Sequence, residues 1–201
     1  MDIGSGAGQN LIDFKQEFPS ANLFAIEPSP DSHEHLSSIN ATVISSDVDS
    51  DWEVGDANKF DLVIMRHVLE HFLDPLTVMK KVHNVLSPDG LLYLAVPNNL
   101  KPTKNLESRW FRVVHTYYFN RSSLYNLFAL AQLEILEVGE GDHFNQAEIF
   151  LVARRASKNL NPKIDNADFV NQRDVFEKQL KKENGIIPRF KRSINNLLKK
   201  S

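Results

Sequence analysis

The chain of 201 residues contains no cysteine. This absence excludes disulfide bonds, catalysis by a thiolate and zinc sites built from cysteine. No apolar run approaches the roughly 18 residues that a membrane-spanning helix needs, and no signal-peptide pattern opens the sequence. We therefore expect a soluble cytoplasmic protein.

Positive charge is scarce over most of the chain. Residues 1–155 carry 12 basic and 21 acidic side chains, a net charge of −9, whereas residues 156–201 carry 11 basic and 5 acidic side chains, a net charge of +6. Because phosphate contacts dominate the binding of nucleic acids, the acidic part is predicted not to bind them. We expect a globular domain over residues 1–155 and a basic helical extension over residues 156–201.

Apolar residues make up 42% of the chain, enough for one buried core, and their order predicts an α/β fold. The predicted strands are residues 1–3, 22–26, 41–45, 60–66, 91–97, 134–138 and 148–153. The predicted helices are residues 9–18, 29–38, 75–87, 122–131, 166–184 and 189–200. The last two strands, joined by a turn at residues 139–142, predict an antiparallel hairpin at the edge of a parallel sheet.

Three glycines at alternate positions, Gly4, Gly6 and Gly8, separate the first predicted strand from the first predicted helix. Glycine permits positive φ and a close approach of a ligand to the backbone, and the first turn of a helix offers unpaired N–H groups. The stretch predicts a cradle for a nucleotide-type ligand, with a turn that binds nothing as the alternative. A dinucleotide fingerprint needs glycine where Gln9 stands, which disfavours an NAD-dependent oxidoreductase.

Polar residues also follow the next three predicted strands. Glu27 ends the second strand, where a carboxylate can accept both hydroxyls of a ribose. Asp47 ends the third, placed to accept from an amine such as that of adenine, and Arg66 and His67 end the fourth. Ligands of open parallel sheets lie outside the carboxyl ends of the strands. These residues therefore predict one ligand site at that edge.

Taken together, these motifs resemble those of the class I S-adenosylmethionine (SAM)-dependent methyltransferases. The resemblance covers residues 1–154, and Leu69-Glu70-His71 followed by Asp74-Pro75 is similar to the subgroup that includes ubiquinone and menaquinone biosynthesis enzymes. It implies a Rossmann-like, doubly wound, mainly parallel sheet with SAM as the cofactor. The cofactor-binding residues that it implies are Asp2, Gly4, Ser5, Gly6, Glu27, Pro28, Asp47, Val48 and Arg66.

The resemblance implies methyl transfer to a small-molecule or carrier-linked acceptor. Residues 98–120 lack periodicity and are rich in aromatic side chains, so they are predicted to form a lid or a wall of the acceptor site. An oxygen acceptor would gain from a general base, and His115 in this connection is the first candidate, ahead of His67 and His71. A structural role is the alternative for each histidine.

The sequence departs from the family in one respect: the family's first strand and the helices before it are missing, because the chain begins at the acidic residue of the first motif. We therefore expect an opened sheet. The alternative function is a truncated, catalytically impaired protein that binds SAM weakly or not at all.

Two further patterns have competing interpretations. The stretch from His67 to His71 fits the His-x-x-Glu-His pattern of zinc hydrolases, but that motif needs a long helix, whereas here it follows a buried strand, so no metal site is predicted. The basic amphipathic helix at residues 189–200 is predicted to contact an anionic membrane or a partner protein. Packing back on the body is the alternative.

Overall fold

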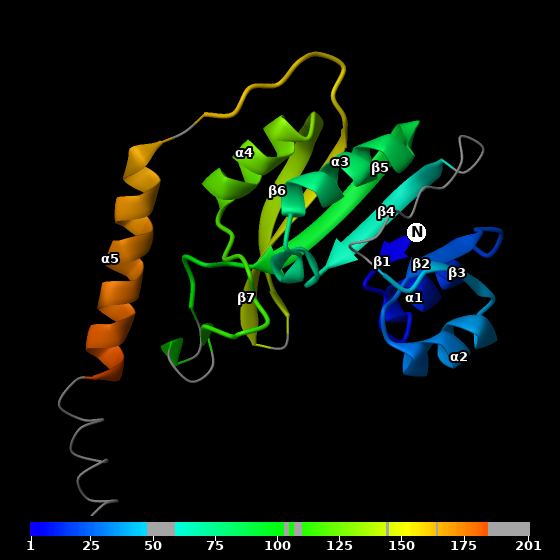
Figure 1. Cartoon of the computed structure of the whole chain (residues 1–201), viewed down its shortest axis with the longest axis horizontal. Coiled ribbons are helices and arrows are strands. Elements are labelled where there is room, and N and C mark those ends of the chain that lie inside the picture. Colours follow the sequence, from blue (N-terminus) through cyan, green and yellow to red (C-terminus); the bar gives the residue numbers. More distant parts are fainter. Residues whose placement is uncertain (48–58, 103–104, 107–109, 144, 164, 185–201) are drawn as a thin grey trace, which may run out of the picture.

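The chain folds around one seven-stranded sheet in the order β3-β2-β1-β4-β5-β7-β6. The computed structural model describes residues 1–47, 59–102, 105–106, 110–143, 145–163 and 165–184 (Figure 1). The strands are β1 Asp2–Ile3, β2 Leu23–Ile26, β3 Ala41–Ser45, β4 Phe60–Arg66, β5 Leu86–Pro97, β6 Leu133–His143 and β7 Gln146–Arg155. β1 to β5 pair in parallel, and β7 is antiparallel to β5 and β6. The predicted Rossmann-like sheet with an antiparallel edge hairpin is confirmed.

Local sequence signals begin the helices. The helices are α1 Gln9–Glu17, α2 Pro30–Ser38, the 3-10 helix η1 Leu69–His71, α3 Pro75–Val85, α4 Arg121–Leu130 and α5 Asn166–Glu183. The Asp74 side chain caps α3 by accepting a hydrogen bond from Thr77 N. Asn120 and Ser123 form a reciprocal capping box at α4, which therefore begins before the predicted residue 122.

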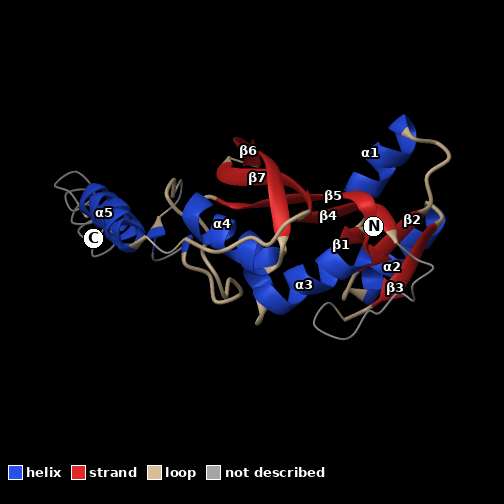
Figure 2. Ribbon diagram, turned by 90° about the horizontal axis from the view of Figure 1, so that it is seen from above, coloured by secondary structure: helices blue, strands red, loops and turns tan. Residues whose placement is uncertain are grey.

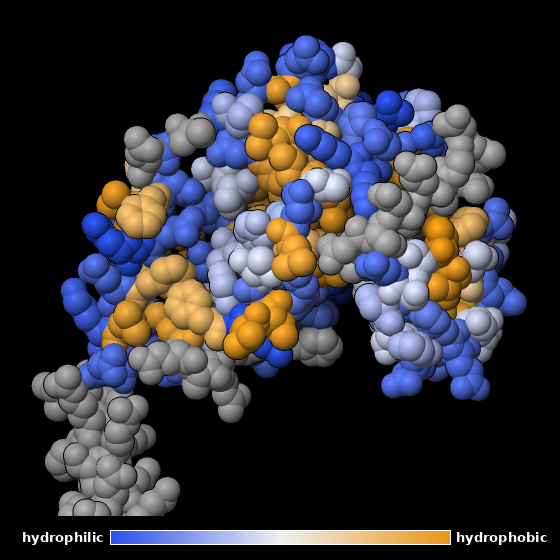
Figure 3. All heavy atoms as spheres, in the orientation of Figure 1, coloured by the Kyte–Doolittle hydropathy of each residue, from blue (hydrophilic) through white to orange (hydrophobic). Residues whose placement is uncertain are grey.

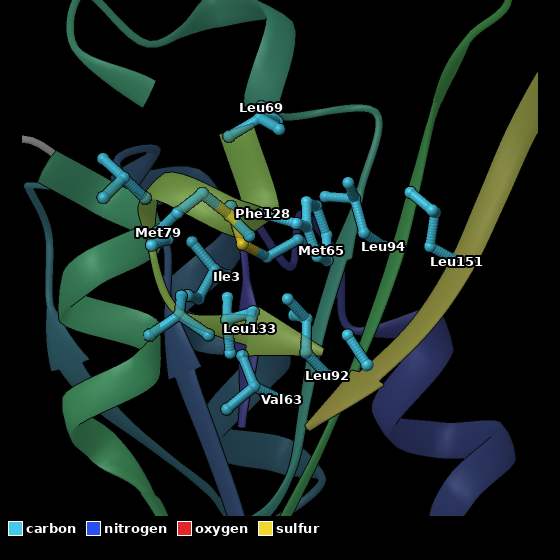
Figure 4. Close-up of a cluster of buried hydrophobic side chains, with 14 of the residues drawn as sticks. Ile3, Val63, Met65, Leu69, Met79, Leu92, Leu94, Phe128, Leu133 and Leu151 are labelled. Carbon is cyan, nitrogen blue, oxygen red and sulfur yellow. The ribbon is translucent and has the colours of Figure 1, made fainter. Parts of the chain in front are cut away.

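Helices cover both faces of the sheet. Leu11 of α1 and Leu36 of α2 pack with Leu23 and Ala25 of β2 in a small cluster. The larger cluster lies beneath α3 and α4, which run along the same face in Figure 2. Figure 4 shows its centre, in which side chains from several elements meet: Ile3, Val63, Met65, Leu69, Met79, Leu92, Leu94, Phe128, Leu133 and Leu151. Burial of these side chains holds the carboxyl ends of the parallel strands at a common edge.

The predicted turn at residues 139–142 is wrong, because these residues belong to β6 and continue the ladder with β7. Gly139 pairs with Phe150, and a Cβ atom at Gly139 would lie 2.1 Å from Cζ of that ring. The glycine is therefore needed for a close cross-strand contact rather than for a turn. The longer hairpin carries His143 and Glu148 to the carboxyl edge of the sheet.

β5 begins at Leu86, before the predicted strand at residues 91–97, and its first residues form an irregularity of the ladder with β4. Phe60 pairs with Leu86, and the next pair, Leu62 with Leu91, lies two residues on along β4 but five along β5. The extra residues leave the regular ladder, and a Cβ atom at Gly90 would lie 2.6 Å from the carbonyl oxygen of Phe60. The predicted helix at residues 75–87 accordingly ends earlier, at Val85.

β1 contains only Asp2 and Ile3, yet it pairs with both neighbours, since Asp2 lies opposite Ala25 of β2 and Ile64 of β4. The sheet is continuous at its centre, which differs from the expected opening. A hollow at the amino end of these strands is lined by apolar side chains that include Met1, Leu11, Phe14, Phe18, Leu23, Phe24, Phe60, Leu62 and Ile64. The carboxyl edge of the sheet, where the ligand site is predicted, is therefore intact, and the hollow lies at the amino edge.

In Figure 1, α5 stands beside the connection between β5 and α4. Asn120 Nδ2 donates to the Asp168 carboxylate at 3.1 Å, and the Phe176 ring meets Phe111 edge-on at 5.2 Å. None of the described helices is long and apolar enough to cross a membrane. The predicted helix at residues 189–200 lies outside the described residues, and the cytoplasmic location and the two-unit division stay predictions.

Candidate functional site

The turn after β1 places three glycines in the left-handed region, with φ of 70° at Gly4, 52° at Gly6 and 83° at Gly8. A Cβ atom at Gly4 would lie 2.6 Å from Val68 Cγ2, and one at Gly8 would lie 2.9 Å from Leu36 Cδ2. A Cβ atom at Gly6 would meet nothing within 4 Å. Gly4 and Gly8 therefore serve packing, whereas Gly6 borders open space in which a ligand can approach the backbone.

Glu27, at the end of β2, is buried and fixes this turn. Its Oε2 accepts a hydrogen bond from Gly6 N at 2.7 Å, and its Oε1 accepts one from Ser29 N at 2.8 Å. The carboxylate thus ties the glycine turn to the loop that contains Pro28. Each carboxylate oxygen has a second lone pair, so Glu27 can still accept hydroxyl groups of a ligand.

Asp2 is fully buried at the base of the cradle. Its Oδ2 accepts a hydrogen bond from Asn10 Nδ2 at 3.1 Å. Burial raises the pKa of Asp2 to about 7, although the bond from Asn10 and the charge of the amino terminus oppose the shift. A cationic ligand group beside Asp2 would favour its ionised form.

Four buried side-chain atoms in the described part of the chain have no hydrogen-bond partner. They are Asp2 Oδ1, Ser5 Oγ, Arg66 Nε and Glu70 Oε2. All four belong to β1, to β4 or to the segments that directly follow these central strands. An unpaired buried polar group costs about 1–3 kcal/mol. Their concentration at one edge indicates a site for a polar ligand, and donors and acceptors are both present.

Arg66 ends β4, His67 follows it, and both contact the carboxylate of Glu148, which comes from β7. Glu148 Oε1 lies 3.5 Å from Arg66 Nη2, and Oε2 lies 2.8 Å from His67 Nε2. The His67 ring stacks on that of His143 at 4.8 Å. Burial lowers the pKa of His67, but hydrogen bonds to Glu70 and Glu148 outweigh this effect, and the pKa is raised. His67 therefore pairs with carboxylates more readily than it acts as a free base.

Glu70 lies at the centre of the three predicted histidines. Its Oε1 lies 3.8 Å from His67 Nδ1 and 4.0 Å from His71 Nε2. His71 meets the His115 ring edge-on at 4.8 Å. Because residues 69–71 form a 3-10 helix rather than an α-helix, His67 and His71 face different partners, Glu148 and the carbonyl of Val114. The zinc-hydrolase arrangement is therefore not formed.

A pocket beside Glu70 is walled mainly by the connection at residues 98–120. It is lined by Glu70, Pro97, Trp110, Arg112, His115, Tyr117, Tyr118, Phe119 and Gln146. Burial lowers the pKa of His115, so this ring is neutral near pH 7. Figure 3 shows hydrophobic atoms gathered on the surface near this connection, where Phe111, Val113 and Val114 are exposed. The pocket lining thus combines aromatic rings with the charged or polar side chains of Glu70, Arg112, His115 and Gln146.

The predicted cofactor residues converge only in part. Asp2, Gly4, Ser5, Gly6 and Glu27 form the cradle, whereas Asp47 is exposed at the end of β3 and Val48 lies outside the described residues. The residues that sequence reasoning missed as members of the site are Glu70, Arg112, His143 and Glu148. A carboxylate at the start of the apolar run of β7 was the one signal for Glu148, since a buried charge needs a partner.

A family profile described as a methyltransferase domain matches residues 1–138, which include the glycine turn, Glu27, Glu70 and His115. The chain belongs to this methyltransferase family. The predicted resemblance is thereby confirmed, and SAM is the cofactor that the family assigns. The roles predicted for individual side chains are not tested by this match.

Individual relatives are more distant. The ubiquinone biosynthesis O-methyltransferase of Haemophilus ducreyi is 44% identical over 43 residues, which make up 21% of this chain and 18% of that protein. A structure of the Haloferax volcanii Trm112 methyltransferase activator in complex with a methyltransferase matches at 14% identity and a TM-score of 0.65, covering 78% of this chain and 81% of that one. A SAM-dependent methyltransferase from Mesorhizobium loti matches at 14% identity and a TM-score of 0.62, covering 77% and 89%. At these identities the structures show the fold alone.

Proposed function

We propose that the chain transfers the methyl group of SAM to an oxygen of a small-molecule or carrier-linked acceptor that lies in the pocket beside Glu70. One observation carries the proposal. Unpartnered buried atoms of Asp2, Ser5 and Arg66 lie at the same edge of the sheet as a pocket lined by aromatic side chains. Glu70 belongs to both sets, so it links the two parts of the site.

The cradle fits the polar end of SAM. Asp2 and the amides of the glycine turn would hold its amino-acid group, Glu27 its ribose hydroxyls and Asp47 its adenine amine. SAM supplies a methyl group that its positively charged sulfur makes reactive. The protein's main task is therefore to align the acceptor with that group, which accounts for up to several kcal/mol of the barrier.

The walls of the pocket supply the remaining chemistry. Trp110, Tyr118 and Phe119 exclude water and position an apolar or aromatic acceptor. His115, kept neutral by its lowered pKa, accepts the proton that the acceptor hydroxyl loses. Arg112 at the same wall would pair with an anionic group of the acceptor.

Calorimetric titration with S-adenosylhomocysteine tests the cofactor part. We expect the wild-type protein to bind and Glu27→Gln to bind about 100-fold more weakly, because a carboxamide accepts fewer hydrogen bonds than a carboxylate and lacks its charge. Glu34→Gln, an exposed carboxylate on α2, is the matched control and should bind normally. Release of S-adenosylhomocysteine with a panel of phenols and alcohols then tests the acceptor.

An impaired methyltransferase is the second candidate. The observation that favours this candidate is the apolar hollow at the amino end of the two-residue β1. A folded wild-type protein that binds no S-adenosylhomocysteine would support impairment and contradict the main proposal.

A further inference from the structure

Glu70, His71 and His115 bring three ligand atoms to one point beside the pocket. One carboxylate oxygen and one nitrogen from each ring lie within 4.8 Å of one another. Metal–nitrogen bonds of about 2.0–2.1 Å place neighbouring ligands about 3–3.5 Å apart, so the group would contract by about 1 Å around an ion. The His71 side chain is 39% exposed and has room to rotate.

One oxygen of the Glu70 carboxylate lacks a partner that a metal ion could supply. Glu70 is 2% exposed, and its Oε2 accepts no hydrogen bond. A buried, unpaired carboxylate oxygen is costly in the absence of a cation. This observation is independent of the histidine geometry and indicates a positively charged ligand.

A backbone carbonyl orients the His71 ring. Its Nδ1 lies 2.7 Å from the carbonyl oxygen of Val114, which can only accept, so Nδ1 carries the proton. Nε2 is the nitrogen that has the lone pair in the neutral ring, and it lies 4.0 Å from Glu70 Oε1. Donation of the second ring nitrogen to a carbonyl is the usual support of a ligating histidine.

The backbone keeps the two contributing segments together. Thr116 N and Tyr117 N donate to the carbonyl oxygen of Glu70 at 2.8 and 3.1 Å. The 3-10 helix that carries Glu70 and His71 is therefore fixed to the segment that carries His115. On such a frame, the contraction around an ion requires movement of the side chains and not of the two backbone segments.

A second group of metal-ligand type, His67, His143 and Glu148, is less suitable. Its carboxylate already contacts Arg66 Nη2 at 3.5 Å and His67 Nε2 at 2.8 Å. His67 lies beside both carboxylates, but the permanent charge of Arg66 lies beside Glu148 alone and would oppose a cation there, whereas the buried Glu70 Oε2 has no hydrogen-bond partner. The difference assigns the ion to the first group.

We propose that Glu70, His71 and His115 bind one divalent ion of the first transition row, such as Zn²⁺, Mn²⁺ or Co²⁺, which carboxylate and imidazole ligands suit. Three protein ligands leave positions open toward the pocket. If the proposed function holds, an acceptor hydroxyl at an open position would lose its proton to solvent more readily. His115 would then act as a ligand rather than as the base.

Titration of the full-length protein with Co²⁺, followed by its visible absorption, tests the site without any assay of activity. We expect one ion per chain, and at least about tenfold weaker binding in Glu70→Gln and in His115→Gln. His143→Gln is the matched control and should bind as the wild type does. Titration of each variant with S-adenosylhomocysteine, independent of the Co²⁺ titration, shows whether the variant is folded and keeps its cofactor site.

The proposal is overturned if folded wild-type protein binds no Co²⁺ below millimolar concentration. It is also overturned if His143→Gln abolishes binding while His115→Gln retains it. Because the wild-type result does not depend on the stability of any variant, a variant that unfolds leaves the test decisive. If the wild-type protein binds S-adenosylhomocysteine but does not bind Co²⁺, the metal site is overturned and the proposed function still stands.

Discussion

The two parts of the site are built differently. The cofactor cradle uses backbone groups and short side chains from residues 2–29, which follow one another along the chain. The acceptor side uses long side chains from η1, from the connection after β5 and from the β6–β7 hairpin, with Glu148 lying 81 residues from His67. Local sequence therefore specifies the cradle, whereas tertiary packing assembles the acceptor side.

The largest expected effect tests how far the cradle depends on packing. Gly4→Ala would place a Cβ atom 2.6 Å from Val68 Cγ2 at a φ of 70°. We expect a loss of about 2–4 kcal/mol in the free energy of unfolding, from overpacking and backbone strain together. Chemical denaturation measures it. Combining Gly4→Ala with Val68→Ala should restore only the part of the unfolding free energy that was lost through overpacking. Full restoration would show that backbone strain at position 4 contributes nothing.

The acceptor side should respond to loss of a single charge. Glu148→Gln leaves Arg66 and His67 without their shared carboxylate, and we expect a loss of about 2 kcal/mol in unfolding free energy, discounted because Arg66 is partly exposed. Glu140→Gln is the control, since its contacts with Lys101 and Arg121 are at the surface. If both variants lost the same unfolding free energy, the buried Glu148 contacts would contribute no more to stability than the surface contacts of Glu140.

The cradle should respond to pH through Asp2. Its raised pKa of about 7 means that the folded protein holds a proton which the unfolded chain releases near pH 4, so this group's contribution to stability falls as pH rises toward 7. Under the proposed function, the cationic amino group of the ligand would lie beside Asp2 and favour its ionised form. We therefore expect the affinity for S-adenosylhomocysteine to fall about tenfold from pH 8 to pH 6. Calorimetry should show that the affinity of Asp2→Asn does not change between pH 6 and pH 8. If the variant keeps the pH dependence of the wild type, Asp2 is not the group responsible for it.

The smallest effect separates ligand approach from packing. Gly6→Ala meets no atom within 4 Å, so the unfolding free energy should fall by only about 1 kcal/mol, the cost of φ near 52° for a residue with a Cβ atom. Its affinity for S-adenosylhomocysteine should nevertheless fall several-fold, because the added methyl group occupies the space of the ligand. Unchanged affinity would show that the ligand does not approach Gly6.

Sequence alone was sufficient wherever the physical cause is local. Alternation of apolar strands and amphipathic helices predicted the fold, and the glycine spacing with Glu27 predicted the cradle, because φ, capping and strand ends depend on neighbouring residues. The same reasoning gave the wrong turn at Gly139, where the cause was the Phe150 ring across the hairpin.

Only the tertiary structure decided how the acceptor side is arranged. Sequence named His67, His71 and His115 separately, but it gave no reason for them to surround Glu70 or for Glu148 to reach His67. Side chains far apart in the chain meet only after the sheet order and the path of the 98–120 connection are fixed. Burial of the core determines the sheet order and the path of this connection, and burial depends on residues from the whole chain rather than on any short stretch.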